Sequence, residues 1–225
     1  MLLPEWHVEQ FEAIDSTQDE LRRRLSTGAD LHGTVIRSAA QTGGRGQRGR
    51  SWSSPPGGSW QSVALRGPVH PAASLFIGIG LAGVLNARLG AGAVVLKWPN
   101  DLQLAVSGGK FAGILCEQAA GHLLTGVGVN VENAPPAGGA ALAGLALSEV
   151  HGLVLDGIGA GWQLMQEQPE RLVSEFTRLD ALRGRRLRQE RGDTVHEGVA
   201  AGIDPGGRLR LLTEAGAVAM DSAVS

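Results

Sequence analysis

The sequence of residues 94–131 is VVLKWPNDLQLAVSGGKFAGILCEQAAGHLLTGVGVNV. Three runs within it are mostly apolar: Val94–Trp98, Phe111–Glu117 and Leu123–Val131. Short apolar runs of this kind are typical of strands that are buried within a sheet. Residues 94–131 therefore predict the interior strands of a central sheet.

Three segments that precede this stretch also have the pattern of strands. They are Trp6–Ile14, Thr34–Ile36 and Ser59–Leu65. The intervening Gln41–Gly58 is rich in glycine and ends in prolines, so it predicts a long loop. After Gly184, short alternating runs separated by turn signals predict a small antiparallel barrel or meander.

Helices are expected between these strands. Thr17 and Glu20 have the spacing of a capping box, which predicts the start of a helix. Two longer helices are expected over Pro71–Leu89 and Asp156–Leu182, the second interrupted at Pro169. The elements together predict an α/β domain to about residue 183 and a β module over residues 184–225.

Composition excludes several classes of protein. The 225 residues are 43% hydrophobic and 19% charged, as in an ordinary globular protein rather than a disordered one. The net charge of -2 gives no indication of nucleic-acid binding. Cys116 is the single cysteine, which excludes a disulfide framework and favours a reducing compartment.

No targeting or membrane segment is expected. The first six residues lack a basic region followed by an apolar run, so no secretory signal is predicted. The longest apolar stretch, Ala72–Leu85, contains three glycines and is shorter than the ~20 residues of a membrane span. We therefore expect a cytoplasmic protein without membrane contact.

Lysine is rare in this chain. Of the 20 basic residues counted as Lys+Arg, Lys97 and Lys110 are the lysines, which leaves 18 arginines. Lysine is a compact point charge on a thin stem, whereas arginine is a wide planar fork. One interpretation of this scarcity is that positions 97 and 110 require the slimmer ammonium group. The other is that it reflects compositional bias alone.

The segment GGRGQRGRSW, residues 43–52, predicts contact with a nucleotide. Glycines let the backbone approach a ligand, arginines fork onto phosphate oxygens, and Trp52 offers a flat face to a ring. A solvated loop or an RNA-binding segment is the alternative.

Polar residues also follow or begin the interior strands. Lys97–Asp101 lies at the end of an apolar run, where ligands of α/β sheets bind, and Asp101 has the chemistry to hold magnesium or orient a nucleophile. Lys110 begins the next apolar run, and Gly126–Asn130 would let a ligand press against a strand. Each segment also has a structural alternative. Lys97–Asp101 could form only a turn, Lys110 could lie at a solvated rim, and Gly126–Asn130 could be a bulged strand of the core.

Five segments in order resemble the biotin–protein ligases, in the short form without an N-terminal DNA-binding domain. They are Ser16–Gln18, Gln41–Trp52, Lys97–Asp101, Lys110–Leu115 and Gly126–Asn130. The resemblance implies a catalytic domain with a central mixed sheet flanked by helices, and a small SH3-like β-barrel at the C-terminus. It also implies two reactions: biotin and ATP, with magnesium, form biotinyl-5'-AMP, and a lysine of an acceptor protein then takes the biotin.

The resemblance further implies site residues and partners. Biotin is expected to contact Ser16, Thr17, Gln18, Gln41, Gly44, Arg45, Gly46, Gln47, Lys110, Gly113 and Gly128. The nucleotide is expected to contact Arg48, Arg50, Trp52, Lys97, Asn100 and Asn130. The implied catalytic residues are Lys110, Arg45 and Asp101, and Asp101 is also the implied magnesium ligand. The implied acceptor is the biotin carboxyl carrier protein of acetyl-CoA carboxylase, and a homodimer is suggested.

The chain departs from the family pattern at named positions. Gln47 stands where the family usually has arginine, which removes one phosphate-facing charge. Residues 220–224 lack the usual glycine–acid pair, so no site residue is assigned to the β module. Only 15 residues precede Ser16, so DNA binding is not expected. A lipoate–protein ligase and a nucleotide- or RNA-binding protein are the alternative functions.

Overall fold

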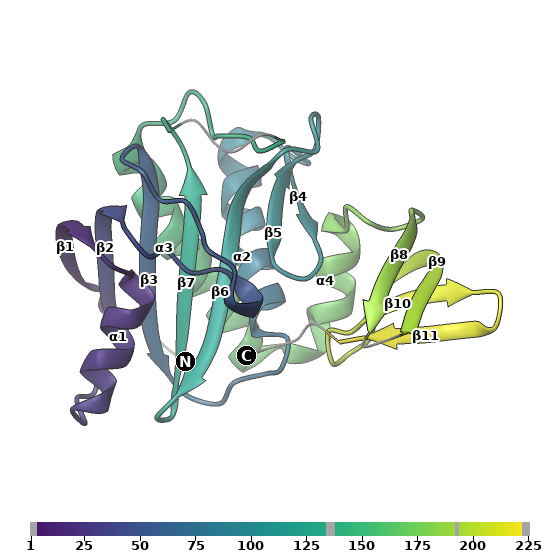
Figure 1. Cartoon of the computed structure of the whole chain (residues 1–225), viewed down its shortest axis with the longest axis horizontal. Helices are drawn as coiled ribbons and strands as arrows, with labels where there is room; N and C mark the ends of the chain where they lie inside the picture. Colours follow the sequence, from purple (N-terminus) through teal and green to yellow (C-terminus); the bar gives the residue numbers. More distant parts are fainter. Residues whose placement is uncertain (1–3, 134–137, 192–193, 222–225) are drawn as a thin grey trace.

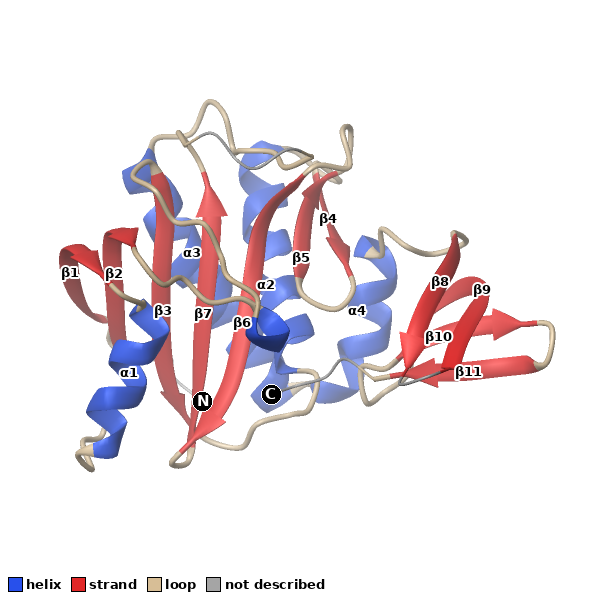
Figure 2. Cartoon of the chain, viewed as in Figure 1, coloured by secondary structure: helices blue, strands red, loops and turns tan. Residues whose placement is uncertain are grey.

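A seven-stranded mixed sheet forms the main body of the protein (Figures 1 and 2). The computed structural model describes residues 4–133, 138–191 and 194–221. The strands in spatial order are β1 (His7–Ile14), β2 (Thr34–Gln41), β3 (Gly58–Arg66), β7 (His122–Asn130), β6 (Lys110–Ala119), β5 (Asp101–Leu104) and β4 (Val94–Lys97). The pair β1 and β2 is parallel and every other neighbouring pair is antiparallel, which confirms the expected mixed sheet.

Helices cover both faces of this sheet. Alternate residues of β3 separate the two cores: Val63 packs in the large core with α2 (Ala73–Leu89) and α3 (Leu147–Glu167), whereas Ala64 packs with α1 (Thr17–Ser26). Successive side chains of a strand point to opposite faces. The helix α1 therefore lies on the face opposite to α2 and α3.

One expected helix cap and one expected helix start were wrong. Ser16, not Thr17, caps α1, because its extended backbone lets its hydroxyl accept from the backbone N–H of Asp19. The helix expected from Asp156 begins at Leu147 instead. The interruption at Pro169 is confirmed: a short 3-10 turn, Pro169–Arg171, separates α3 from α4 (Leu172–Leu179).

Glycines explain how closely α2 and α3 approach. A Cβ on Gly80 would lie 2.2 Å from the carbonyl oxygen of Gly157 and 2.3 Å from the nitrogen of Gly161. No side chain fits at that distance, so the two backbones are in direct contact at this crossing. Three of the 34 glycines of the chain, Gly80, Gly157 and Gly161, therefore serve helix packing rather than ligand binding.

The C-terminal strands form a separate four-stranded antiparallel sheet (Figure 1). Its order follows the chain from β8 (Arg186–Arg191) through β9 (Thr194–Ile203) and β10 (Leu209–Thr213) to β11 (Gly216–Met220), which is a meander. Within the described residues, no pairing of β8 with β11 closes this sheet. The expected turn at residues 192–193 and the departure at 222–224 lie outside the described residues.

This second sheet packs against the main body. The indole nitrogen of Trp98 donates to the carbonyl of Gly207 at 2.9 Å, and Leu209 and Leu211 are buried in the same core as α2. The division near residue 183 stays a prediction. In the part of the chain that is described, no helix is both long enough and apolar enough to cross a membrane.

Candidate active site

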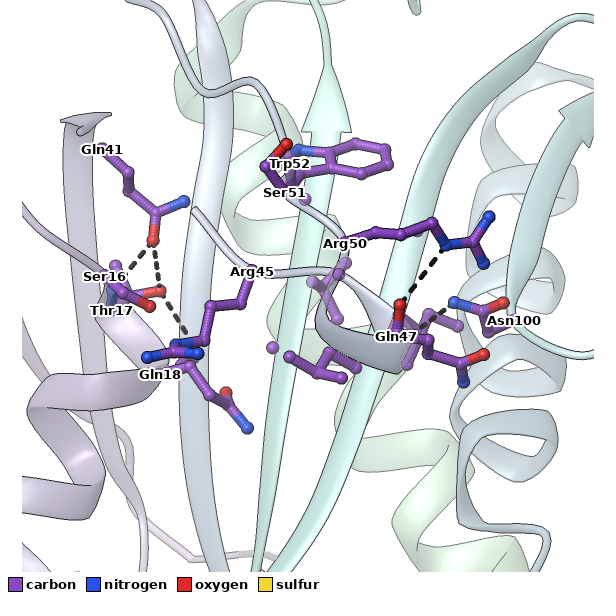
Figure 3. A pocket seen from close by; sticks show the side chains of 18 of the residues that line it. Ser16, Thr17, Gln18, Gln41, Arg45, Gln47, Arg50, Ser51, Trp52 and Asn100 are labelled. Carbon is purple, nitrogen blue, oxygen red and sulfur yellow. Dashed lines mark hydrogen bonds between the residues drawn. The ribbon is translucent and has the colours of Figure 1, made fainter. Parts of the chain in front are cut away.

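A cavity of about 300 Å³ lies on the α1 face of the sheet (Figure 3). Its floor is formed by β3, β6 and β7, and the loop between β2 and β3 crosses over it. Fifteen of the residues expected from the resemblance line it: Ser16, Thr17, Gln18, Gln41, Arg45, Gly46, Gln47, Arg50, Trp52, Asn100, Asp101, Lys110, Gly113, Gly128 and Asn130. Segments far apart in the sequence therefore meet at one hollow.

Three expected contacts do not line the cavity. Arg48 and Lys97 are exposed outside the lining. Gly44 is buried within the loop itself, where a Cβ would be 2.4 Å from the carbonyl oxygen of Trp52 and 2.7 Å from the hydroxyl of Ser54. Gly44 thus lets two parts of the loop pass each other, and its contact with biotin stays a prediction like those of Arg48 and Lys97.

One end of the cavity is built from hydroxyl and amide groups, and we call it the hydroxyl–amide end: Ser16, Thr17, Gln18, Gln41 and Ser62. The backbone N–H of Thr17 donates to Gln41 Oε1 at 2.8 Å, and the Thr17 hydroxyl donates to the same oxygen at 3.1 Å. The Ser62 hydroxyl lies 2.8 Å from Thr17 Oγ1 and therefore donates to it. These directions leave the lone pairs of Ser62 available as acceptors.

Gln18 offers a second acceptor at this end. Its Nε2 donates to Glu117 Oε2 at 2.7 Å and to the carbonyl of Leu124 at 3.3 Å. Its Oε1 is buried and has no hydrogen-bond partner among the described residues. The hydroxyl–amide end is thus uncharged, buried and rich in acceptors, which fits a neutral ligand group that carries N–H donors.

Trp52 lies across two glycines on the cavity floor. A Cβ on Gly128 would be 2.6 Å from its indole nitrogen, and a Cβ on Gly113 would be 3.0 Å from its ring. The ammonium group of Lys110 lies 4.8 Å from the centre of the ring, within cation–π range. The glycines of β6 and β7 therefore seat the indole, and the indole borders the lysine.

Lys110 is paired with the carboxylate of Asp101. Their Nζ and Oδ1 atoms are 2.6 Å apart across the neighbouring strands β5 and β6. Asp101 is the one carboxylate among the described lining residues, and no group of three or more His, Cys, Asp or Glu side chains gathers to hold a metal there or elsewhere in the described chain. Magnesium prefers octahedral oxygen ligands, so Asp101 alone fits a metal carried in by phosphates rather than one held by the protein.

Asn100 and Asn130 use their amides to hold the chain. Asn100 Nδ2 donates to the carbonyl of Ile114 at 2.8 Å, and Asn130 Nδ2 donates to the carbonyl of Ala140 at 3.3 Å. Both residues border the cavity, but their amide N–H groups fix neighbouring segments of backbone. Their expected contact with a nucleotide stays a prediction.

The segment 43–52, which we call the arginine loop, places most of its charge at the surface. Arg45 is half exposed and its Nε lies 2.6 Å from Asp19 Oδ2, while Arg50 Nε donates to the carbonyl of Gln47 at 3.3 Å. Arg48 adopts a left-handed backbone with φ of 58°. The loop is closed by its own backbone bonds and anchored on the sheet by Trp52.

Sequence reasoning missed several lining residues, and Ser62 is the most informative. Ser62, Gln61 and Ser59 are polar residues within the central strand β3, and all three are buried. Buried polar residues in a central strand require partners, so they mark a site or an internal network. Gln61 belongs to such a network, because it bonds Arg37, Ser59 and His151.

Two titratable groups near the site are uncharged at neutral pH, the half-buried His151 and the buried Cys116. Burial, reinforced by the nearby Arg37, lowers the pKa of His151 to about 4. Burial raises the pKa of the Cys116 thiol to about 12, as in a packed small hydrophobic residue rather than a nucleophile. Neither group takes part in the chemistry described below.

Comparison with known proteins identifies the family. The Biotin/lipoate A/B protein ligase family matches residues 10–133. The "Biotin--[acetyl-CoA-carboxylase] ligase" of Mycobacterium tuberculosis is 40% identical over 129 residues, which are 53% of this chain and 47% of that protein. The "Bifunctional ligase/repressor BirA" of Escherichia coli is 35% identical over 219 residues, which are 88% of this chain and 67% of that protein.

The chain thus spans about half the length of the Mycobacterium tuberculosis relative. Among solved structures, the biotin protein ligase from Aquifex aeolicus in complex with biotin and ATP superposes with a TM-score of 0.81 at 24% identity, covering 97% of each chain. That likeness establishes the fold of both sheets. By the matched half of its sequence and by its fold, the chain belongs to the Biotin/lipoate A/B protein ligase family.

Proposed function

We propose that this protein is an ATP-dependent biotin–protein ligase. In the first step the carboxylate oxygen of biotin attacks the α-phosphorus of ATP, the bond to the β-phosphate breaks, and biotinyl-5'-AMP and pyrophosphate form. In the second step the amine of an acceptor lysine attacks the acyl carbon and AMP leaves. The observation that carries the proposal is that one cavity joins the hydroxyl–amide end to Lys110 and the arginine loop.

Each end of the cavity matches one part of the reactants. The head of biotin is a neutral urea with two N–H donors and one carbonyl, and the hydroxyl–amide end offers buried hydroxyls and amides to it. The reacting groups are two anions, which repel until positive charge lies between them. Lys110 and Arg50 line the cavity where such charge is needed.

Lys110 is the proposed centre of the chemistry. Its ammonium is held by Asp101 on one side and the face of Trp52 on the other. A charge held in advance stabilises the developing negative charge without reorganising during the reaction. Magnesium bound to ATP would further neutralise the phosphates, and Asp101, the carboxylate in the described lining, would contact it.

Arg45 is the third proposed catalytic residue. Its guanidinium is paired with Asp19 in this structure, so contact with biotin or phosphate requires that it turn away from that carboxylate. Gln47 is buried in the lining and carries no charge, so the phosphates gain no neutralisation at the position where the family usually has arginine.

A lipoate–protein ligase is the second candidate within the family. The ring of lipoate has neither N–H nor carbonyl groups and would leave the hydroxyl–amide end unpaired, which is costly for buried polar groups. RNA binding is disfavoured by the net charge of -2. The structure of the cavity therefore favours biotin over both alternatives.

The partners are proposed on the same basis. Relatives named for the acetyl-CoA-carboxylase ligase activity suggest that the acceptor is the biotin carboxyl carrier protein of that enzyme. The single buried Cys116 is compatible with a cytoplasmic location, where such a carrier and ATP occur together. A homodimer is a further proposal that the family suggests.

Release of pyrophosphate tests the proposal. The purified chain is incubated with magnesium–ATP and either biotin, lipoate or octanoate, and pyrophosphate is measured with and without the apo carrier protein. We expect biotin to give release at least about a hundredfold faster than lipoate, because unpaired buried groups penalise the wrong head group. Release that responds to lipoate and not to biotin would replace the proposal by the second candidate.

A further inference from the structure

Glu117 lies outside the lining of the cavity, yet its side chain holds one of the lining residues. We propose that Glu117 is a positioning residue that fixes the amide of Gln18, so that Gln18 presents Oε1 to the ligand and the cavity selects a head group with an N–H donor. This inference rests on the proposed function, because it concerns how the urea of biotin is recognised.

The geometry allows one orientation of the Gln18 amide. Its Nε2 lies 2.7 Å from Glu117 Oε2 and 3.3 Å from the carbonyl oxygen of Leu124. A carboxylate oxygen and a carbonyl oxygen both accept hydrogen bonds and donate none. Turning the amide over would bring Oε1 against two acceptors, so Nε2 has to face them and Oε1 has to face the cavity.

The carboxylate of Glu117 is itself held from α1. The guanidinium of Arg22 pairs with Glu117 and with Asp19, one turn away on the same helix. This pairing fixes the position of the Glu117 carboxylate, whose oxygens accept hydrogen bonds. Arg22 and Glu117 thus form a brace between α1 and β6, behind the hydroxyl–amide end.

The atom that Glu117 turns toward the ligand is left without a partner. Gln18 Oε1 is buried and has no hydrogen-bond donor among the described residues. A structure that leaves a buried acceptor unpaired is disfavoured by about tenfold to a hundredfold relative to one that pairs it. A Cβ on Gly126 would lie 2.9 Å from this oxygen and 3.3 Å from Ser62 Oγ, so the glycine leaves room between two acceptors. An N–H group of the ligand in that space would satisfy them.

The identity of residue 117 therefore decides whether Gln18 presents a hydrogen-bond acceptor or a donor to the cavity. With an amide at 117, the partner of Gln18 can donate as well as accept, and the Gln18 amide is free to turn. A turned amide presents an N–H to the cavity, which favours a ligand with an acceptor in place of the donor. Specificity for biotin would fall although the residues that touch it are unchanged.

The test uses ligands that differ only in this donor. They are biotin and the two cyclic-carbamate analogues in which one ureido N–H is replaced by oxygen. Dissociation constants are measured by calorimetry for the wild type, Glu117→Gln and Glu117→Asp, and thermal unfolding checks that each is folded. Asp keeps the charge beside Arg22 but draws the carboxylate away from Gln18. Glu20→Gln, which removes a charge from an ion pair on α1 outside the cavity lining, is the matched control.

We expect the wild type to prefer biotin over at least one carbamate by about tenfold or more, and both Glu117 variants to reduce this preference at least about fivefold. The KM for biotin should rise in both variants, whereas kcat at saturating biotin should stay within about twofold, since the reacting atoms are untouched. Glu20→Gln should keep the wild-type preference.

Two results would overturn the inference alone. One is a wild type that binds biotin while its preference is unchanged in both Glu117 variants. The other is an equal loss of preference in Glu20→Gln, which would mean that any disturbance of α1 has the same effect. A folded wild type that neither binds biotin nor releases pyrophosphate with it would overturn the proposed function, and this inference with it.

Discussion

The two sides of the cavity differ in how firmly their groups are held. In the hydroxyl–amide end, Thr17 and Ser62 are almost fully buried and bonded to each other, and Thr17 is also bonded to Gln41. In the arginine loop, Arg45 and Arg50 are exposed, and their partners are the partly buried carboxylate of Asp19 and a carbonyl of the loop itself. Recognition of the neutral head is therefore built in advance, whereas the charge for the phosphates is held loosely at the surface.

This difference follows from the cost of burying each kind of group. Neutral hydroxyls and amides can be buried at little cost when they bond one another. Arginines that have no anion beside them cannot be buried at little cost, because an unpaired charge in a cavity is strongly disfavoured. A site that binds a neutral head and a triphosphate is thus expected to be rigid at one end and exposed at the other. Lys110 lies between them, partly buried and already paired with Asp101.

The largest effect is expected at the junction of the two sides. Lys110→Arg keeps the charge but places a wider head between Asp101 and Trp52, beside Gly113. Adenylate formation should fall about a hundredfold or more, because stabilisation of the developing charge depends on the position of the ammonium. Single-turnover pyrophosphate release measures this step. Activity equal to the wild type would show that the slim lysine is not required.

A smaller effect is expected from overfilling the cavity floor on which Trp52 lies. Gly128→Ala places a methyl group 2.6 Å from the indole nitrogen of Trp52, so the ring has to move toward the cavity. Biotin affinity in calorimetry should fall about tenfold to thirtyfold, in keeping with the cost of overpacking. Gly83→Ala on α2 is the control, because no atom lies within 4 Å of its added Cβ. It should leave affinity unchanged and raise stability by about 0.5–1 kcal/mol.

The exposed side should respond differently. Arg50→Gln removes a charge from the lining of the arginine loop, so the KM for ATP should rise about fivefold to tenfold while the dissociation constant of biotin stays within about twofold. Arg210→Gln, an exposed arginine on β10, controls for the loss of one positive charge. A parallel loss of biotin affinity in Arg50→Gln would mean that the two sides are not separable.

The smallest effect concerns stability beneath the rigid side. The neutral ring of His151 is bonded to Ser59, and its pKa is lowered to about 4 by burial and by Arg37. Because the unfolded chain takes up this proton near pH 6.5, the stability that the neutral ring contributes is complete above pH 6.5. It is lost as the pH falls from 6.5 toward 4.

Solvent screening reduces this contribution, so the expected loss is about 1 kcal/mol in the free energy of unfolding between pH 6.5 and 5. Urea unfolding at several pH values measures it. His151→Gln cannot take up the proton and should show a flatter pH dependence over this range. An identical pH dependence in the variant would assign the loss to other groups.

The elements that have a strong local sequence pattern were predicted correctly. The apolar runs of residues 94–131 became β4, β6 and β7, and the glycine-rich stretch from Gln41 became the loop over the cavity. The strand β5 (Asp101–Leu104) was missed, because its four residues follow a polar segment that has the composition of a turn. Its pairing with β4 and β6 comes from tertiary contacts that no local pattern encodes.

The candidate site could be predicted only in part, again because local patterns do not encode tertiary contacts. Motifs identified most of the lining, but not which of the residues bond to each other or to the backbone. The partner of Gln18 is Glu117, 99 positions away along the chain, and the seat of Trp52 combines glycines of two strands. Hydrogen-bond direction and packing at such separations emerge only once the sheet has formed.

The proposed function depends most directly on whether the preformed hydroxyl–amide end accepts biotin. Calorimetric titration of biotin into the purified, folded chain measures this without requiring turnover or an acceptor protein. We predict saturable binding at one site per chain, in the absence of ATP, with affinity reduced in Gly128→Ala and retained in Gly83→Ala. No detectable heat from biotin, either alone or with a non-hydrolysable ATP analogue, would contradict the account.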